Sequence, residues 1–389
     1  MSTLLVLGEG IMYETRGIWV DKRQLLEGEE YIEDLFAKLK EANFNAVNLC
    51  TYFQGHVIYP DSEFLLQHPE YTEKDYLDMA INLARKYDLE VYAWMEWGFY
   101  GYHAPDITKS DTLGPIFDKH PNWLSIDRHG NYFIRNPQWG DFVPMSPVNY
   151  DAQDFLIDIH VETIKKYPFD GIDLDRIRYG TGDFCFSDPV RILFLRDTGI
   201  DIREMEKGSA EEALFTEWKQ AKLNFFVEKL ATALRDTRPD IRITSAVAPP
   251  YRIDELGQDW PTWAEYGWVD GLSPMLYGRD IGDQAERAQD LVPENFAMLY
   301  GLSCDNEPEV LEQQIRKVRE LGAKGVVLWY AGTVEKHLDH LKNTVFSEPA
   351  KDATTPGEIG PDYTMPELKL EDVEPREIIP VETREPGQE

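Results

Sequence analysis

The chain has 389 residues and a mass of 45.0 kDa, with 42% hydrophobic and 12% aromatic residues, which excludes a disordered protein, a fibre and a small disulfide scaffold. Its formal net charge of −32 argues against nucleic acid or an anionic membrane as a partner, because both would repel it. Residues 1–10 lack the positively charged start and the small-residue cleavage site of a signal peptide, so we predict no export signal. No stretch of 18 consecutive apolar residues occurs, so we predict no membrane span. The compartment and the oligomeric state stay open.

Eight short apolar runs alternate with amphipathic helical stretches at intervals of about 40 residues. The predicted strands are 17–20, 46–50, 90–95, 171–175, 242–247, 271–277, 296–300 and 325–330. The predicted helices are 31–42, 73–87, 154–166, 216–235 and 308–321. This alternation predicts a single (β/α)8 barrel over residues 1–345, with ligands bound at the carboxyl ends of the strands.

Three segments do not fit the regular alternation. Residues 98–150 and 179–209 follow the third and fourth strands, and we expect them to form long loops that build the mouth of the barrel. Residues 346–389 are acidic and proline-rich, without an apolar period. Such a sequence buries too little surface to offset its ordering entropy, so we predict an extended or disordered tail. A strap across the barrel and a spacer to another element are the alternatives.

The fourth predicted strand carries the strongest chemical signal. In the run Phe169–Tyr179, alternate side chains share one face of a strand, so Asp173 and Asp175 should point into the barrel, with Asp175 nearer the rim. Two inward carboxylates are costly unless they are paired or hydrogen-bonded, and a purely structural strand would carry Val or Ile there. The pattern therefore favours a functional role.

The same alternation puts Tyr92, Trp94 and Glu96 on the inner face of the third strand, with Trp97 just beyond. Burial against Trp94 and Trp97 would raise the pKa of Glu96 and keep it protonated as a general acid. Asp175, beside Arg176 or Arg178, would stay ionised. Two carboxyls in unlike environments are what the cleavage of a glycosidic bond needs.

Aromatic side chains near the predicted strand ends suit, as a group, the apolar faces of sugar rings, whereas each of them taken singly is expected to pack in the core. They are Trp94, Trp97, Trp260, Trp263, Trp329 and Tyr330. Further candidates for substrate contacts are Asp173, Arg178, Asn48, Tyr277 and Asp280. Asp280 is the reserve acid should Glu96 be misplaced, and Tyr277 could hydrogen-bond Asp175 or a sugar hydroxyl. Arg16 is expected to bridge to Asp173 across the barrel floor.

Other chemistries have weaker support. Three cysteines lie far apart, and the eight histidines show no H-x-x-x-H or H-E-x-x-H spacing, so we predict no metal site and no cofactor. The triplet Asp173-Leu174-Asp175 could be the metal-binding D-x-D of a nucleotide-sugar transferase, but no phosphate-binding glycine loop accompanies it. A G-x-S-x-G nucleophile elbow is absent from the sequence.

The sequence resembles the glycosyl-hydrolase-like family 10 proteins, also called DUF187, from about Thr15 to Tyr330. The matching segments are 15–20, 42–47, 93–99, 120–124, 169–175 and 270–277. The resemblance implies a (β/α)8 glycoside hydrolase, and some relatives act on bacterial cell-wall glycan stripped of peptide. The family motifs carry over to Asp175 and Glu96. Relatives often have His or Gln in place of Asp173, which implies a supporting role, and many relatives are exported.

The run Asp170–Asp175 also looks like the family 18 chitinase motif, but Ile177 stands at the position of its catalytic Glu and cannot donate a proton. We therefore expect a glycoside hydrolase with Asp175 as nucleophile or base and Glu96 as general acid, acting on an oligosaccharide or glycan strand. The alternative is a catalytically silent barrel that binds carbohydrate.

Overall fold

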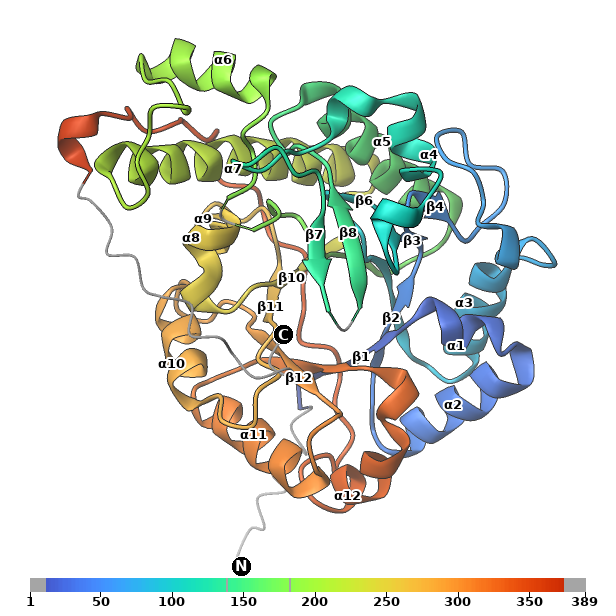
Figure 1. Ribbon diagram of the computed structural model, residues 1–389. Helices are drawn as coiled ribbons and strands as arrows, with labels where there is room; N and C mark the ends of the chain where they lie inside the picture. The colour runs from blue at the N-terminus through green and yellow to red at the C-terminus, as the bar shows by residue number, and fades with distance from the viewer. Residues whose placement is uncertain (1–11, 138, 182, 374–389) are drawn as a thin grey trace, which may run out of the picture.

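The computed structural model describes residues 12–137, 139–181 and 183–373, and within them a parallel eight-stranded sheet forms the centre of the fold (Figure 1). Its strands are β1 (Thr15–Val20), β2 (Ala46–Cys50), β5 (Glu90–Met95), β9 (Gly171–Leu174), β10 (Arg242–Val247), β11 (Gly271–Pro274), β12 (Leu299–Ser303) and β13 (Gly325–Trp329). The order is β11-β10-β9-β5-β2-β1-β13-β12, and bridges from Leu272 to Met298 and from Met275 to Gly301 join the two end strands. The predicted (β/α)8 barrel is confirmed.

Helices surround the sheet, and each buries an apolar stripe against it. They are α1 (Lys22–Leu26), α2 (Glu29–Glu41), α3 (Tyr76–Lys86), α5 (Tyr150–Lys166), α7 (Ala210–Thr237), α8 (Ile253–Leu256), α9 (Trp260–Glu265), α10 (Gly282–Asp290), α11 (Pro308–Glu320) and α12 (Leu338–Asn343). In α2 the buried residues Ile32, Leu35, Phe36 and Leu39 recur at helical spacing. Side-chain caps start several helices, as where Ser209 accepts the Glu212 backbone N–H at the start of α7.

The seventh barrel strand begins later than predicted. The sequence pattern placed it at 296–300, whereas β12 runs from Leu299 to Ser303. Phe296 lies in a turn in which its backbone N–H donates to Pro293, and Met298 joins β11 only through an isolated bridge. The apolar character of Phe296 therefore reflects packing at the entry to the strand.

The two long segments at the mouth contain regular elements of their own. Residues 98–150 include β6 (Tyr100–Ala104), α4 (Gly114–Lys119), β7 (Ile134–Asn136) and β8 (Gly140–Pro144), and α6 (Asp188–Thr198) lies in the second segment. The strands form an antiparallel sheet in the order β6-β8-β7, and a smaller hairpin joins β3 (Tyr52–Phe53) to β4 (His56–Val57). The 3-10 turns are η1 (Pro69–Tyr71), η2 (Ile107–Lys109), η3 (Pro121–Trp123), η4 (Pro250–Arg252), η5 (Ala331–Thr333), η6 (Glu335–His337) and η7 (Leu370–Asp372).

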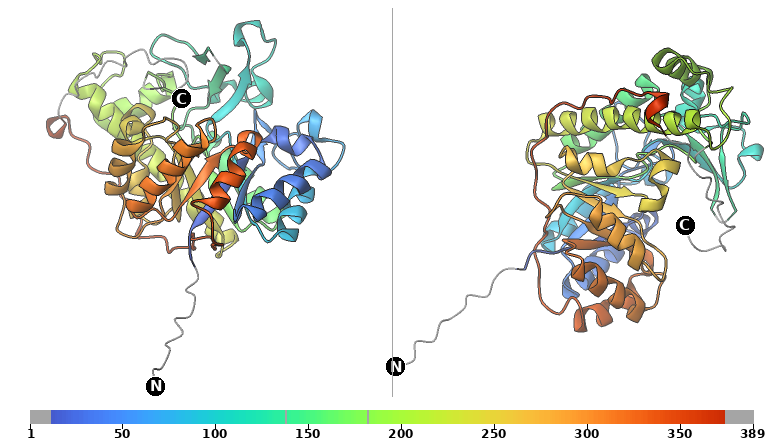
Figure 2. Two further views of the ribbon diagram at one scale, coloured as in Figure 1. Left: turned by 90° about the horizontal axis from the view of Figure 1, so that it is seen from below. Right: turned by 90° about the vertical axis from the view of Figure 1, so that its left-hand side faces the viewer.

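The described part of the tail runs under the barrel and then along α7, at the end of the barrel opposite the β6-β8-β7 sheet (Figure 2). The side chain of Asp352 is buried in the barrel floor, where its carboxylate accepts hydrogen bonds from Thr15 Oγ1 at 2.5 Å and Tyr92 Oη at 2.6 Å and pairs with Arg242 at 2.9 Å. Further on, Tyr363 packs on α7. We call residues 347–373 the strap. Residues 374–389 and 1–11 lie outside the described residues, and the domain boundary at residue 346 stays a prediction.

Arg16 does not bridge to Asp173 as expected. Its guanidinium pairs with Glu14 at 2.6 Å and donates to the carbonyl of Glu348 at 2.7 Å. Successive residues of a strand face opposite sides, so Arg16 and Trp19, three residues apart, point in opposite directions. Trp19 is the residue of β1 that contacts Asp173. Arg16 therefore connects β1 to the start of the strap.

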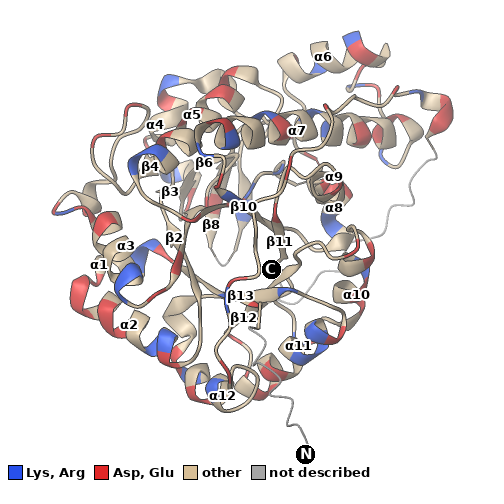
Figure 3. Cartoon of the chain, turned by 180° about the vertical axis from the view of Figure 1, so that it is seen from behind, with Lys and Arg blue, Asp and Glu red and all other residues tan. Residues whose placement is uncertain are grey.

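Acidic residues are spread over the outer helices, with basic residues between them (Figure 3). In the part of the chain that the structure describes, the acidic residues are thus not gathered at one site. Among the described residues, none of the helices combines the length and the apolar character that crossing a lipid bilayer requires.

Candidate active site

Asp173 is fully buried inside the barrel on β9. Its Oδ2 accepts hydrogen bonds from Trp19 Nε1 at 2.8 Å and Asn48 Nδ2 at 2.9 Å. Its Oδ1 accepts a third from Thr244 Oγ1 at 2.8 Å. The donors stand on β1, β2 and β10, so one carboxyl group links four strands. Burial raises the pKa of Asp173 to about 6, and the three hydrogen bonds oppose that rise.

Asp175 follows β9 directly and is buried nearer the mouth. Trp94 Nε1 donates to its Oδ2 at 3.1 Å, and the backbone N–H of Arg176 donates to its Oδ1 at 2.6 Å. Burial raises the pKa of Asp175, while the charges of Arg176 and Arg178 act in the opposite direction. Both donors favour the ionised form, so the geometry suits a carboxylate that reacts as an anion.

Glu96 lies in a network of charges at the end of β5. Its Oε2 accepts from Lys22 Nζ at 2.9 Å, and its Oε1 from the Arg176 guanidinium at 3.3 Å. Arg176 also donates to the Glu96 carbonyl at 2.8 Å, and Lys22 pairs with Asp21 at 3.0 Å. The thiol of Cys50 lies 3.5 Å from Glu96 Oε2. The network connects the loop after β1 to the residues that follow β9.

This environment differs from the one expected for Glu96. We expected contacts with Trp94 and Trp97 to keep the side chain protonated, but two cations, Lys22 and Arg176, contact its carboxylate. Asp175 and Glu96 do come together, since Arg176 contacts both of them.

Gly98 allows the chain after β5 to approach the backbone of the fourth strand closely. A Cβ at this position would lie 2.4 Å from the Asp175 carbonyl oxygen and 2.6 Å from that of Arg176, and its φ is +28°. The next residue, Phe99, donates its backbone N–H to the Arg176 carbonyl at 3.1 Å. Arg176 itself has a left-handed backbone with φ +50°, which aims its N–H at the Asp175 carboxylate.

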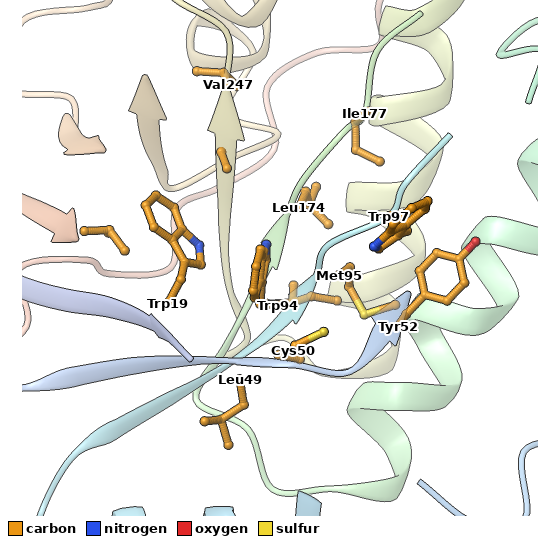
Figure 4. Close-up of a cluster of buried hydrophobic side chains, with 14 of the residues drawn as sticks. Trp19, Leu49, Cys50, Tyr52, Trp94, Met95, Trp97, Leu174, Ile177 and Val247 are labelled. Atoms are coloured by element: carbon orange, nitrogen blue, oxygen red, sulfur yellow. The ribbon is translucent and has the colours of Figure 1, made fainter. Parts of the chain in front are cut away.

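Indole rings surround the two aspartates. Trp94 lies 6.4 Å from Trp19 and 5.7 Å from Trp329 between ring centroids, and Trp329 lies 6.2 Å from Trp19. Trp19 and Trp94 stand on the same side of their strands, and Leu49 points to the opposite side (Figure 4). The predicted alternation of inner and outer residues therefore holds for these strands.

Tyr277 and Arg178 complete the surroundings of Asp175. Tyr277 stacks on Trp329 at 6.2 Å, and burial together with the charge of Asp175 raises its pKa. Its hydroxyl is not hydrogen-bonded to Asp175. Arg178 has a buried Nε without a partner and makes no hydrogen bond or ion pair within the described part of the chain. Its guanidinium is thus available to a ligand beside Asp175.

Other predicted residues lie further from this group. Asp280 is exposed on the loop after β11, where its carboxylate accepts the Gly282 backbone N–H at 3.1 Å. Trp97 is buried against Phe142 at 5.7 Å, and Tyr330 is half-buried beside Trp329.

Trp260 and Trp263 do not line the candidate site. Both rings are fully buried, and their Nε1 atoms donate to the Ala248 carbonyl and to Asn224 Oδ1. They belong to the core between α7 and α9. Their aromatic character alone could not distinguish packing from sugar binding.

Sequence reasoning missed three residues of the site. Trp19 and Thr244 both hydrogen-bond Asp173, and Lys22 pairs with Glu96. For Trp19 and Thr244 a signal existed, because each sits on the inward face of a predicted strand. Lys22 lies in the first turn after β1, where a lysine usually faces solvent. Among the described residues, no three His, Cys, Asp or Glu side chains gather in a group that could hold a metal ion.

Comparison with known proteins agrees with this architecture. The chain is 15% identical to the PgaB (BpsB) glycoside hydrolase domain from Bordetella bronchiseptica, covering 85% of this chain and 98% of that one with a TM-score of 0.61. It is 10% identical to the catalytic domain of a beta-amylase from Paenibacillus polymyxa, covering 87% and 99% with a TM-score of 0.63. At these identities the likeness concerns the fold.

Curated relatives include the glycosyl hydrolase DigH of Escherichia coli K12, which is 20% identical over 226 residues, or 52% of this chain and 46% of the relative. The chain thus spans about half the length of the curated relatives that it matches. The family described as "Glycosyl hydrolase-like 10" matches residues 14–297, from the start of β1 to the residues before β12. The chain therefore belongs to the glycosyl hydrolase-like 10 family.

Proposed function

We propose that the protein is a glycoside hydrolase that cleaves an oligosaccharide or glycan strand at Asp175. The proposal rests on the surroundings of the Asp175 carboxylate at the end of β9, which accepts two N–H hydrogen bonds. The unpaired guanidinium of Arg178 and the ring of Tyr277 lie beside it. An ionised carboxylate can act on the anomeric carbon as a nucleophile, or as a base through a water molecule. Arg178 and the aromatic rings then orient the sugar.

The ion pairs of Glu96 support a positioning role for that residue. Its carboxylate contacts Lys22 and Arg176, so it can hold the Arg176 guanidinium and thereby the N–H that contacts Asp175. Asp280, the reserve acid on the loop after β11, is then the candidate for the proton donor; it is exposed, and among the described groups its carboxylate accepts only the Gly282 backbone N–H.

Peptide-free bacterial cell-wall glycan is the first substrate to test, on the basis of the resemblance to family members that act on it. The full chain is incubated with this glycan and with chitin, cellulose and xylan oligomers, and the products are analysed by mass and by the anomer formed. Asp175→Asn should remove turnover while the circular dichroism spectrum stays unchanged. Full activity in Asp175→Asn would refute the assignment.

Two further variants separate the remaining roles. Asp280→Asn should reduce kcat, and an activated substrate that needs no protonation should restore its activity. Glu96→Gln should lower kcat without that rescue, because it disturbs the position of Arg176. If the activated substrate restores Glu96→Gln and not Asp280→Asn, Glu96 is the proton donor. Binding of a glycan without any hydrolysis by the unsubstituted protein would instead identify a silent carbohydrate-binding barrel.

A further inference from the structure

Trp139 differs from every other tryptophan of the chain. All ten tryptophans lie in the described residues, and Trp139 alone is mostly exposed, with 55% of its surface open to solvent. It stands in the turn between β7 and β8, next to Gly140. An indole exposed on a hairpin that packs against the candidate site has an apolar face available to a ligand.

The backbone around Trp139 is held tightly. Its N–H donates to Asn136 Oδ1 at 2.8 Å, and its carbonyl contacts the ring of His103 on β6. Gly140 has φ +94°, and a Cβ there would lie 2.7 Å from the Ala104 carbonyl oxygen. The turn therefore packs directly against β6, and the indole is presented from a fixed support.

The β7-β8 hairpin is also anchored by its charges. Asp141 is buried, and its Oδ2 accepts hydrogen bonds from the backbone N–H of Ile107 and from Arg135, both at 3.0 Å. These contacts tie β8 to β7 on one side and to η2 on the other. A hairpin with both strands fixed can present a side chain without a large entropy cost on binding.

The same hairpin contacts the charge network of the candidate site. Phe142 on β8 packs against Trp97 at 5.7 Å, and the Arg176 guanidinium lies 5.8 Å from the Phe142 ring. Arg176 in turn contacts Asp175 and Glu96. Trp139 precedes Phe142 by three residues, which is about 10 Å along a strand. That distance exceeds the width of one sugar ring.

The arrangement of the elements agrees with this estimate. Figure 1 shows the β7-β8 hairpin crossing in front of the barrel, and the side view of Figure 2 shows it on the same side as the mouth. The turn that bears Trp139 lies at the free end of the hairpin. A glycan bound at Asp175 and extending under the hairpin would thus meet Trp139 with a later ring of the chain.

We propose that Trp139 is a stacking platform for a sugar ring of the glycan, at a subsite distinct from the one at Asp175. The ligand class is a pyranose with equatorial substituents, because such a ring offers flat faces of axial C–H bonds to an indole. The platform rests on the proposed function, since it takes the same glycan. It makes the protein selective for chains of several sugars over disaccharides.

The test measures binding by titration calorimetry in Asp175→Asn protein, which keeps the ligand intact, with and without Trp139→Ala. The probes are hexasaccharides and disaccharides of β-1,4-linked N-acetylglucosamine and of β-1,4-linked glucose, together with peptide-free cell-wall glycan. For the hexasaccharide or glycan that binds, Trp139→Ala should weaken binding about tenfold, the usual effect of removing an aromatic anchor. Disaccharide binding should be unchanged, and Trp139→Phe should retain most of the affinity.

The matched control is Tyr13→Ala. Tyr13 is 61% exposed, and its backbone pairs with Lys351 of the strap, at the opposite end of the barrel from the mouth. Its removal should leave every affinity unchanged. Bound hexasaccharide should also protect Trp139 from quenching by acrylamide, and this protection should be lost in Trp139→Phe.

The outcomes separate the two proposals. If the hexasaccharide or the glycan binds Asp175→Asn protein equally well with and without Trp139→Ala, the stacking role of Trp139 is refuted and the proposed function is unaffected. A protein that binds and hydrolyses no member of the substrate set would overturn the proposed function and the platform together. A tenfold loss that extends equally to disaccharides would place Trp139 at the Asp175 subsite and refute the separate position.

Discussion

Asparagine at position 173 isolates the energetic effect of a charge inside the barrel. Asp173 receives hydrogen bonds from Trp19 and Asn48 on one oxygen and from Thr244 on the other. Asparagine has the same shape and can accept the first two bonds through its oxygen. Its amide N–H can donate to the Thr244 hydroxyl, which accepts as readily as it donates. The substitution therefore removes the charge and keeps all three hydrogen bonds.

The magnitude follows from the pKa of Asp173, which burial raises from 3.8 to about 6. The folded protein therefore holds this proton in a pH range where the unfolded chain has lost it. Stability from this group is greatest below pH 4, falls as the pH rises from about 4 to about 6, and stays low above that range. The pKa difference corresponds to about 3 kcal/mol of unfolding free energy.

The free energy of unfolding of Asp173→Asn, relative to the wild type, should thus increase by about 2 kcal/mol between pH 4 and pH 7, most of the full difference. Urea unfolding followed by tryptophan fluorescence at several pH values measures this difference. Asp111→Asn, at an exposed aspartate, is the control and should show no such trend. A difference that is constant with pH, or that shrinks toward pH 7, would show that the protein does not bind the proton at Asp173.

Two further predictions concern the strap and the reacting carboxylate. Asp352→Ala removes the acceptor of the Tyr92 hydroxyl and one anion beside Arg242. The free energy of unfolding, measured by urea titration, should therefore fall by about 2 kcal/mol. An unchanged free energy of unfolding would show that the strap does not stabilise the barrel. Burial raises the pKa of Asp175 and Arg178 opposes this rise, so Arg178→Gln should move the acid limb of kcat/KM to higher pH. A limb that moves to lower pH would contradict an ionised Asp175 as the reacting group.

The barrel was predictable because its strands are local patterns. The apolar runs at 46–50, 90–95 and 242–247 coincide with β2, β5 and β10, since each is a continuous buried segment bounded by polar residues. Alternation along β9 and β5 also placed Asp173 and Trp94 on the inner face. These inferences need only the period of two residues in a strand.

The partners of the charged groups were not predictable in the same way. Lys22 and Glu96 are 74 residues apart, and their contact depends on how β1 and β5 are placed around the closed sheet. The environment of Glu96 was therefore misjudged from its neighbours in sequence. The elements within residues 98–150 were missed because β7 and β8 are short strands whose pairing comes from a tight turn and from contacts with β6.

The strap has a consequence for the synthesis of the protein. Asp352 follows Tyr92 by 260 residues and Arg242 by 110, yet it fills the space between them in the barrel floor. A chain emerges from the ribosome with its N-terminus first, so every strand of the barrel is made before the residue that closes the floor. Until Asp352 has left the exit tunnel, the Tyr92 hydroxyl lacks its acceptor and Arg242 lacks one of its carboxylate partners, so the floor of the barrel is completed only after translation has passed the last strand.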